Sequence, residues 1–155
     1  MPHIFEYSHT VTEDEIDVLR HANNVAYIEW LQSAAVAHSA AQGWPAQRYQ
    51  DLGLGWVVRS HAIEYLRPAF ADDRIVVRTW VATMSKATSI RRYRILRPAD
   101  DALLATAETR WAFINFSTRQ PLRIPSEIAD AFTLVDDVPT KAGKPQQKAE
   151  VSFEN

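Results

Sequence analysis

A single alanine-rich segment with helical periodicity constrains the fold of this chain more than any other feature. From Asn24 to about Gln42, large apolar side chains recur at helical spacing, and many of the positions between them are alanine. Small side chains let a sheet approach a helix closely, and Gly43 provides a stop signal. The segment therefore predicts one long helix packed against a sheet.

The segments on both sides of this helix have the two-residue periodicity of β-strands. One strand is expected before the helix and four after it, at residues 3–11, 54–67, 74–84, 89–97 and 103–116. A chain of this order predicts an α+β fold, a five-stranded antiparallel sheet with one long helix inserted after its first strand.

Two finer expectations concern the end of the predicted domain. One face of the last strand is expected to carry Leu103, Ala105, Ala107, Trp111 and Phe113. A short helix is expected within residues 126–133.

Length and composition point to one domain. The chain has 155 residues, its net charge is -2, and it lacks the basic excess that is typical of nucleic-acid-binding proteins. It contains no cysteine, which excludes disulfides and thiolate chemistry, and no stretch approaches the ~20 apolar residues of a membrane span. We expect a soluble cytoplasmic protein with a globular domain at 1–135 and a disordered polar tail at 136–155.

Aromatic residues are more numerous than one half-covered sheet requires. Six rings lie on the predicted strands: Trp56, Tyr65, Trp80, Tyr93, Trp111 and Phe116. One helix covers only part of such a sheet, so we expect some of these rings to contact a second subunit of a homo-oligomer.

Four polar residues gather immediately before the long helix, namely Asp17, His21, Asn23 and Asn24. The first N–H groups of a helix lack intrahelical partners, so a capping asparagine and a nearby acid form one interpretation. A cap explains one polar residue but not four. In the alternative interpretation, free N–H groups stabilise an oxyanion while the carboxylate attacks a carbonyl or activates water, as ester or thioester hydrolysis requires.

The stretch DVLRHANNVAYIEWLQ resembles the signature of the hotdog-fold acyl-CoA thioesterases of the 4-hydroxybenzoyl-CoA thioesterase family, near its long-chain acyl-CoA thioesterase branch. That signature runs Asp-x-x-x-His-x-Asn-Asn-x-x-Tyr, and every position is filled, by Asp17, His21, Asn23, Asn24 and Tyr27. The segments IEYLRPAFADDRIVVRT and WAFINFSTRQPLRIP are similar to later parts of the family, so the resemblance covers about residues 5–130.

The resemblance implies a hotdog fold, an acyl-CoA substrate, no cofactor, and a homodimer or homotetramer with active sites at the dimer interface. It implies that Asp17 is the catalytic nucleophile or general base. Backbone N–H groups around Asn23 and Asn24 are expected to polarise the thioester carbonyl. His21 and Asn24 are expected to be positioning residues, and Tyr27 a pocket wall or hydrogen-bond donor.

Two positions depart from the pattern of many relatives, which carry Asp-x-Asp before a glycine and the histidine. Here Glu15 takes the first acidic position and Arg20 the glycine position. We expect Arg20 to narrow the pocket mouth or to alter the acyl preference.

Other histidines and the glycines give weaker signals. His61 follows Ser60, but neighbouring strand residues point to opposite faces, so His61 is expected to be structural or to line the substrate pocket across the dimer. His21 and His38 lack metal-ligand spacing, so no metal site is expected. The four glycines form no phosphate-binding loop, which excludes nucleotide cofactors held by such loops.

An arginine run occupies the third strand after the helix, at positions 91, 92, 94 and 97. It predicts a solvated sheet face or, for Arg91 and Arg92, contacts with the phosphates of coenzyme A. The leading hypothesis is hydrolysis of an acyl-CoA. The alternatives are a hotdog-fold acyl dehydratase, an acyl-carrier-protein thioesterase and a noncatalytic acyl-CoA binding module, with neither nucleic acid nor membrane as a partner.

Overall fold

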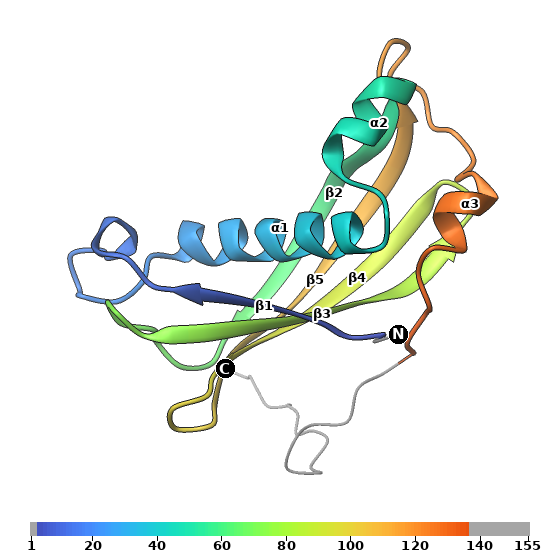
Figure 1. Ribbon diagram of the computed structural model, residues 1–155. Helices are drawn as coiled ribbons and strands as arrows, with labels where there is room; N and C mark the ends of the chain where they lie inside the picture. The colour runs from blue at the N-terminus through green and yellow to red at the C-terminus, as the bar shows by residue number, and fades with distance from the viewer. Residues whose placement is uncertain (1–2, 137–155) are drawn as a thin grey trace.

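The computed structural model describes residues 3–136 and has an α+β fold built on one antiparallel sheet (Figure 1). Its strands are β1 (Phe5–Thr10), β2 (Leu54–Tyr65), β3 (Arg74–Ser85), β4 (Thr88–Arg97) and β5 (Ala102–Asn115). They lie in the order β1-β3-β4-β5-β2, so β1 and β2 are the edges. The predicted fold class is confirmed, while the expected tail lies outside the described residues, except for Asp136.

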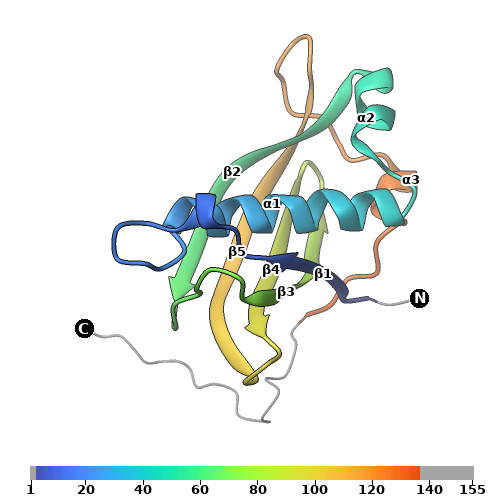
Figure 2. The same ribbon diagram turned by 60° about the vertical axis from the view of Figure 1, so that its left-hand side comes forward.

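Helix α1 (Asn24–Ala41) follows β1 and the short 3₁₀ turn η1 (Glu13–Glu15), and it runs across one face of the sheet, as predicted (Figures 1 and 2). Its buried alanines let the strands approach it, since Ala34 is 0% exposed and packs in one cluster with Val77 of β3 and Ile95 of β4. Among the described residues, no helix is long and apolar enough to cross a membrane.

A second helix, α2 (Ala46–Leu52), follows α1 and is not expected from the sequence. Seven residues are too few for a helical period to stand out. Its limits are nevertheless set by local chemistry, because Pro45 lies at its N-cap and Gly53 ends it with a φ of 74°. Trp44 and Tyr49 are buried here, in a second apolar cluster.

The short helix α3 (Ser126–Ala129) lies within the predicted range and contributes Ile128 to this second cluster. The cluster also contains Val81 of β3 and Phe113 of β5. Its residues come from the elements at the C-terminal end of α1, where Figure 1 shows α2 and α3.

One irregularity in β5 corrects the predicted core face. Leu104 is fully buried, whereas Leu103, which was expected to share a face with Ala105, is half-buried. The pairing with β4 shifts between Ile95 and Leu96, so Leu104 is an extra residue that reverses the alternation. Ala105 and Phe113 lie in the core as predicted.

The six aromatic residues expected at a subunit interface lie in different environments. Trp80 and Tyr93 are already buried within one chain. Tyr65 and Phe116 are 41% and 39% exposed, and the other two rings line a cavity described below.

Candidate functional site

The start of α1 is capped by Asn23. Its Oδ1 accepts the N–H of Ala26 at 2.8 Å, and its own N–H donates to the carbonyl oxygen of Glu15 at 2.7 Å. The Asn23 N–H is therefore not available to a substrate, which narrows the predicted set of oxyanion donors. In residues 3–136, the N–H groups of Asn24 and Val25 have no acceptor.

Asp17 lies in a tight turn immediately before this cap. Its Oδ1 accepts the N–H groups of Leu19 at 2.9 Å and His21 at 3.2 Å, and its N–H donates to the His21 carbonyl at 2.8 Å. A bridge between Ile16 and Ala22 closes the turn and places Asp17 opposite His21, two residues before the cap Asn23. Within the described part of the chain, Oδ2 has no partner and is free for chemistry.

Arg20 occupies the outer corner of this turn in the left-handed region, with a φ of 67°. That conformation suits glycine, so Arg20 carries a backbone strain that glycine at this position would not have. The guanidinium lies in solvent and pairs with the exposed Glu13 at 3.3 Å.

Glu15 has a structural role at the first acidic position. Its carboxylate accepts hydrogen bonds from His9 Nε2 at 2.9 Å, Trp30 Nε1 at 2.9 Å and the Thr12 N–H at 3.0 Å. Burial raises the pKa of Glu15, but these hydrogen bonds outweigh burial and hold that pKa below its usual value. Glu15 thus joins β1, η1 and α1, a role that the sequence analysis did not assign.

The loop between β2 and β3 supports the other side of the turn. The ring of Phe70 meets the ring of His21 edge-on at 5.4 Å, and the Ala69 carbonyl accepts the Ala22 N–H at 2.8 Å. Tyr65 OH donates to the Asn24 carbonyl at 3.3 Å. These contacts hold the turn against the sheet.

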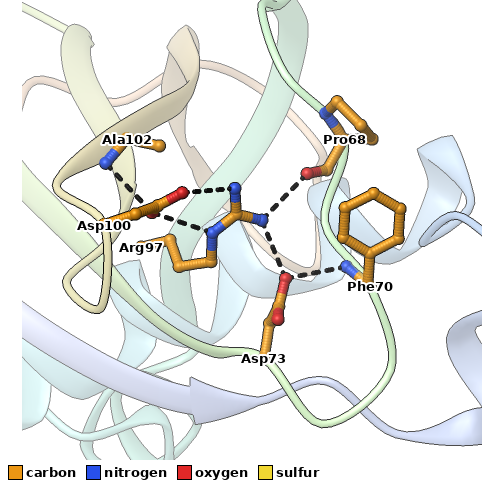
Figure 3. Close-up of polar contacts among 6 residues, drawn as sticks. All are labelled: Pro68, Phe70, Asp73, Arg97, Asp100 and Ala102. Atoms are coloured by element: carbon orange, nitrogen blue, oxygen red, sulfur yellow. Dashed lines mark hydrogen bonds and ion pairs between the residues drawn. The ribbon is translucent and has the colours of Figure 1, made fainter.

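Arg97 anchors that loop, as Figure 3 shows. Its Nη1 donates to Asp73 at 2.8 Å and to the Pro68 carbonyl at 3.1 Å, while its Nε and Nη2 each donate to Asp100 at 3.0 Å. Asp73 in turn accepts the Phe70 N–H at 2.9 Å. The hydrogen bonds with Asp100 and Asp73 raise the pKa of Arg97 above its usual value, so it stays charged. Arg97 had no role of its own in the sequence analysis; the signal for its partner Asp73 is the acidic pair within the segment IEYLRPAFADDRIVVRT.

Tyr27 does not line an open pocket. It is 2% exposed and packs in the core between the rings of Trp30 and Tyr65, at 4.7 Å and 5.0 Å. Within one chain Tyr27 has a packing role, because the first turn of α1 directs this side chain into the sheet; its role as a pocket wall or hydrogen-bond donor for the substrate stays a prediction. Burial raises the pKa of Tyr27.

The structure separates the predicted binding residues on β2 and β4. The Nδ1 of His61 lies 2.8 Å from Thr109 Oγ1, and burial lowers the pKa of His61. Arg91 is 6% exposed and lies beneath α1, so the expectation of a solvated sheet face is wrong for this residue, while its contact with coenzyme A phosphates stays a prediction. Arg92 points to the opposite face, as neighbours on a strand must, and pairs with Glu108 at 3.2 Å.

A cavity of about 220 Å³ lies at the far end of α1, between the second half of that helix, α2 and the sheet. Its walls include Trp56 and Trp111. Ser39 of α1 lines it and stands 15 residues after Asn24, which at about 1.5 Å per residue is roughly 22 Å along the helix. The Asp17 turn and the cavity are therefore separate places in one chain.

Comparison with known proteins gives a consistent result. The sequence model described as the thioesterase-like superfamily matches residues 11–132. An acyl-CoA thioester hydrolase, YbgC, of Escherichia coli O6:H1 is 27% identical over 117 residues, which cover 74% of this chain and 83% of the relative. An acyl-[acyl-carrier-protein] hydrolase of Cuphea viscosissima is 28% identical over 87% of this chain and 35% of its own length.

Solved structures share the fold. A 1,4-dihydroxy-2-naphthoyl-CoA thioesterase from Synechocystis superposes with a TM-score of 0.77 at 19% identity, covering 83% of this chain and 94% of the other.

Proposed function

The chain belongs to the thioesterase-like superfamily, and on that premise we propose that it hydrolyses an acyl-CoA thioester to a free acid and coenzyme A. The observation that carries the proposal is the Asp17 carboxylate, held through Oδ1 and open at Oδ2, beside a helix start with two N–H groups that lack acceptors in residues 3–136.

In this proposal the Asp17 Oδ2 attacks the thioester carbonyl or takes a proton from an attacking water. The N–H groups of Asn24 and Val25, at the positive end of α1, stabilise the oxyanion that forms. His21 positions the acyl group, and the edge-on contact with Phe70 fixes the orientation of the His21 ring. When Asp17 attacks, collapse of the oxyanion breaks the carbon–sulfur bond and leaves an anhydride between the acyl group and Asp17; water then hydrolyses this anhydride to the free acid and supplies the proton for the coenzyme A thiolate. When Asp17 activates water instead, the acid forms directly as the carbon–sulfur bond breaks, and the proton that Asp17 took from water passes to the departing thiolate.

We also propose a homodimer or homotetramer with the site at a subunit interface. The support is exposed apolar surface around the Asp17 turn, since Val18 is 95%, Leu19 70% and Val25 64% exposed. The outer edge of β2 offers twelve residues for pairing with a second chain. His61 would line the pocket across such an interface, and the half-exposed Arg92 remains a proposed contact for coenzyme A phosphates.

The test is thiol release from short, long and aryl acyl-CoAs, each compared with the same acyl group on an acyl carrier protein. The carrier arm is included because the Cuphea viscosissima relative is an acyl-[acyl-carrier-protein] hydrolase. Turnover of at least one acyl-CoA with a preference over the carrier form supports the proposal. Turnover of the carrier forms alone assigns the other thioesterase class, and no turnover of any thioester overturns the proposal.

A further inference from the structure

The cavity beneath the second half of α1 has one charged residue in its wall, Arg91 of β4. The rest of the wall is mainly aromatic and apolar: Trp44, Tyr49, Trp56, Trp111 and Phe132 are among its residues. Its volume of about 220 Å³ exceeds the ~150 Å³ of an engineered apolar cavity that binds benzene. The space is large enough for a phenyl ring or a medium-length alkyl chain.

Arg91 is buried without a carboxylate. Its Nη1 donates to Nδ1 of His38 at 2.9 Å and to Oγ1 of Thr79 at 3.1 Å, and both are neutral acceptors. None of the ion pairs within residues 3–136 includes Arg91. A buried guanidinium keeps its charge, so a side chain that is 6% exposed and has no counter-ion calls for an anion.

The unused side of Arg91 has the geometry of an anion site. Both N–H groups of Nη1 are used, whereas Nε and Nη2 have no acceptor in the described part of the chain. Those two nitrogens form the edge that binds a carboxylate with two parallel hydrogen bonds. Among the described residues, the fully buried side-chain nitrogen and oxygen atoms without a hydrogen-bond partner are Trp80 Nε1 and Tyr93 OH. Nε and Nη2 of Arg91 are not among them, so these two nitrogens keep accessible surface, which we assign to the cavity that Arg91 lines.

Three other polar side chains of the cavity wall already have partners, while Gln50 is exposed to solvent. Ser39 Oγ donates to the Trp44 carbonyl at 2.7 Å, and Ser89 Oγ donates to the Thr83 carbonyl at 2.8 Å. Trp56 Nε1 donates to the Tyr49 hydroxyl. Burial and the neighbouring Arg91 lower the pKa of His38 to about 4, so His38 adds no second charge at neutral pH.

We infer that this cavity binds an organic carboxylate, with its carboxylate on Nε and Nη2 of Arg91 and its apolar body among the aromatic rings. A single cation in an apolar wall favours a monoanion over a phosphate dianion. The carboxylate has two possible sources, a free carboxylic acid or the far carboxyl group of a dicarboxylic acyl-CoA. The first form stands without the proposed function. The second rests on it and on the proposed oligomer: the Asp17 turn of the same chain lies roughly 22 Å from the cavity along α1, beyond the reach of a medium-length acyl chain, so a second subunit would hold the thioester.

The first arm measures binding of octanoate by isothermal titration calorimetry, with octan-1-ol, octylamine and octyl phosphate as matched probes. Octanoate is expected to bind at least about tenfold more tightly than each of the other three, because only octanoate offers a carboxylate monoanion to Nε and Nη2 of Arg91. Equal binding of octan-1-ol or octylamine, tighter binding of octyl phosphate, or no binding of octanoate overturns the inference.

Two variants test the role of Arg91. Arg91→Met keeps an unbranched side chain as far as the position of Nε and removes the guanidinium charge, and it should weaken octanoate at least about tenfold while leaving octan-1-ol unchanged. Gln50 is exposed at the cavity wall, so Gln50→Glu leaves the fold intact and should weaken octanoate by about two- to fivefold through repulsion, with Gln50→Ala as its control. If Arg91→Met fails to fold, Gln50→Glu decides alone, and unchanged octanoate affinity in it contradicts the inference.

The second arm separates the two sources. If the substrate supplies the carboxylate, suberoyl-CoA is hydrolysed with a higher kcat/KM than octanoyl-CoA, and Arg91→Met removes that preference. If a free acid is the ligand, octanoate binds but suberoyl-CoA has no advantage. Octanoate binding without any thioester turnover overturns the proposed function alone, and turnover without carboxylate selectivity in either arm overturns this inference alone.

Discussion

At the scale of residues, the helix start divides its polar side chains between folding and chemistry. Asn23 and Glu15 are committed to hydrogen bonds that hold the turn, whereas Asp17 keeps a free oxygen. The sequence predicted this cluster but not the division, because a side chain that accepts a backbone N–H and one that awaits a substrate are the same residue type. Arg91 was expected on a solvated sheet face because arginine is usually exposed. The alternation of β4 instead places its side chain on the buried face, which the residue type alone does not reveal.

Arg20→Gly is expected to raise the free energy of unfolding by about 0.5–1 kcal/mol. The left-handed conformation costs an L-residue about 1–2 kcal/mol, and part of the gain is lost to the greater freedom of glycine in the unfolded chain. Urea unfolding measures the change. Arg20→Ala is the control, because it removes the ion pair with Glu13 while keeping the strained backbone. A gain in the alanine variant equal to that in the glycine variant would contradict the explanation.

Asn23→Ala should lower the free energy of unfolding by about 1 kcal/mol, because the N–H of Ala26 loses its cap. Asn24→Ala is the matched variant. Asn24 is exposed, so its loss should change stability by less than about 0.5 kcal/mol. Thermal and urea unfolding of both proteins compare the two positions, and equal losses would rule out a cap specific to Asn23.

At the scale of elements, periodicity predicted the long helix and the strands, and it failed where an element is short or irregular. Helix α2 has seven residues, and the bulge at Leu104 inserts one residue into the alternation of β5. Neither leaves a periodic signal. The contacts between elements could not be predicted from the sequence either. Arg97, for example, donates a hydrogen bond to Asp73, which lies 24 residues earlier in the chain, in the loop between β2 and β3.

The packing of α1 on the sheet through His38 predicts a loss of stability in acid. His38 has a pKa of about 4 in the folded protein and 6.5 in the unfolded chain, so the unfolded chain binds more protons between these values. Stability is fully present above pH 6.5 and falls as the pH drops toward 4, by at most about 3 kcal/mol.

Urea unfolding at pH 7.5 and 4.5 tests this effect in the wild type and in His38→Gln. The wild type should lose about 2 kcal/mol more than the variant between the two pH values. The comparison cancels other titrating groups. Identical losses would show that His38 is not the group responsible.

At the scale of the whole molecule, a single sheet wraps one helix and leaves the β2 edge and the Asp17 turn uncovered (Figure 2). Sedimentation equilibrium is expected to find a dimer or tetramer at micromolar concentrations. The physical reason is the apolar surface of Val18, Leu19 and Val25, whose exposure to water in a monomer is unfavourable. A monomer at all concentrations that is nonetheless active would contradict the proposed interface site.

The most direct measurement of the central claim is thiol release from the best acyl-CoA by Asp17→Asn, with Asp14→Asn as the matched control. Asp14 is an exposed acid of η1, three residues away, so its variant should keep kcat/KM within about twofold. Asp17→Asn should lose at least about 10²-fold while its circular dichroism and melting temperature stay close to those of the wild type. Full activity in a folded Asp17→Asn protein would contradict the assignment of thioester hydrolysis to the carboxylate at the start of α1.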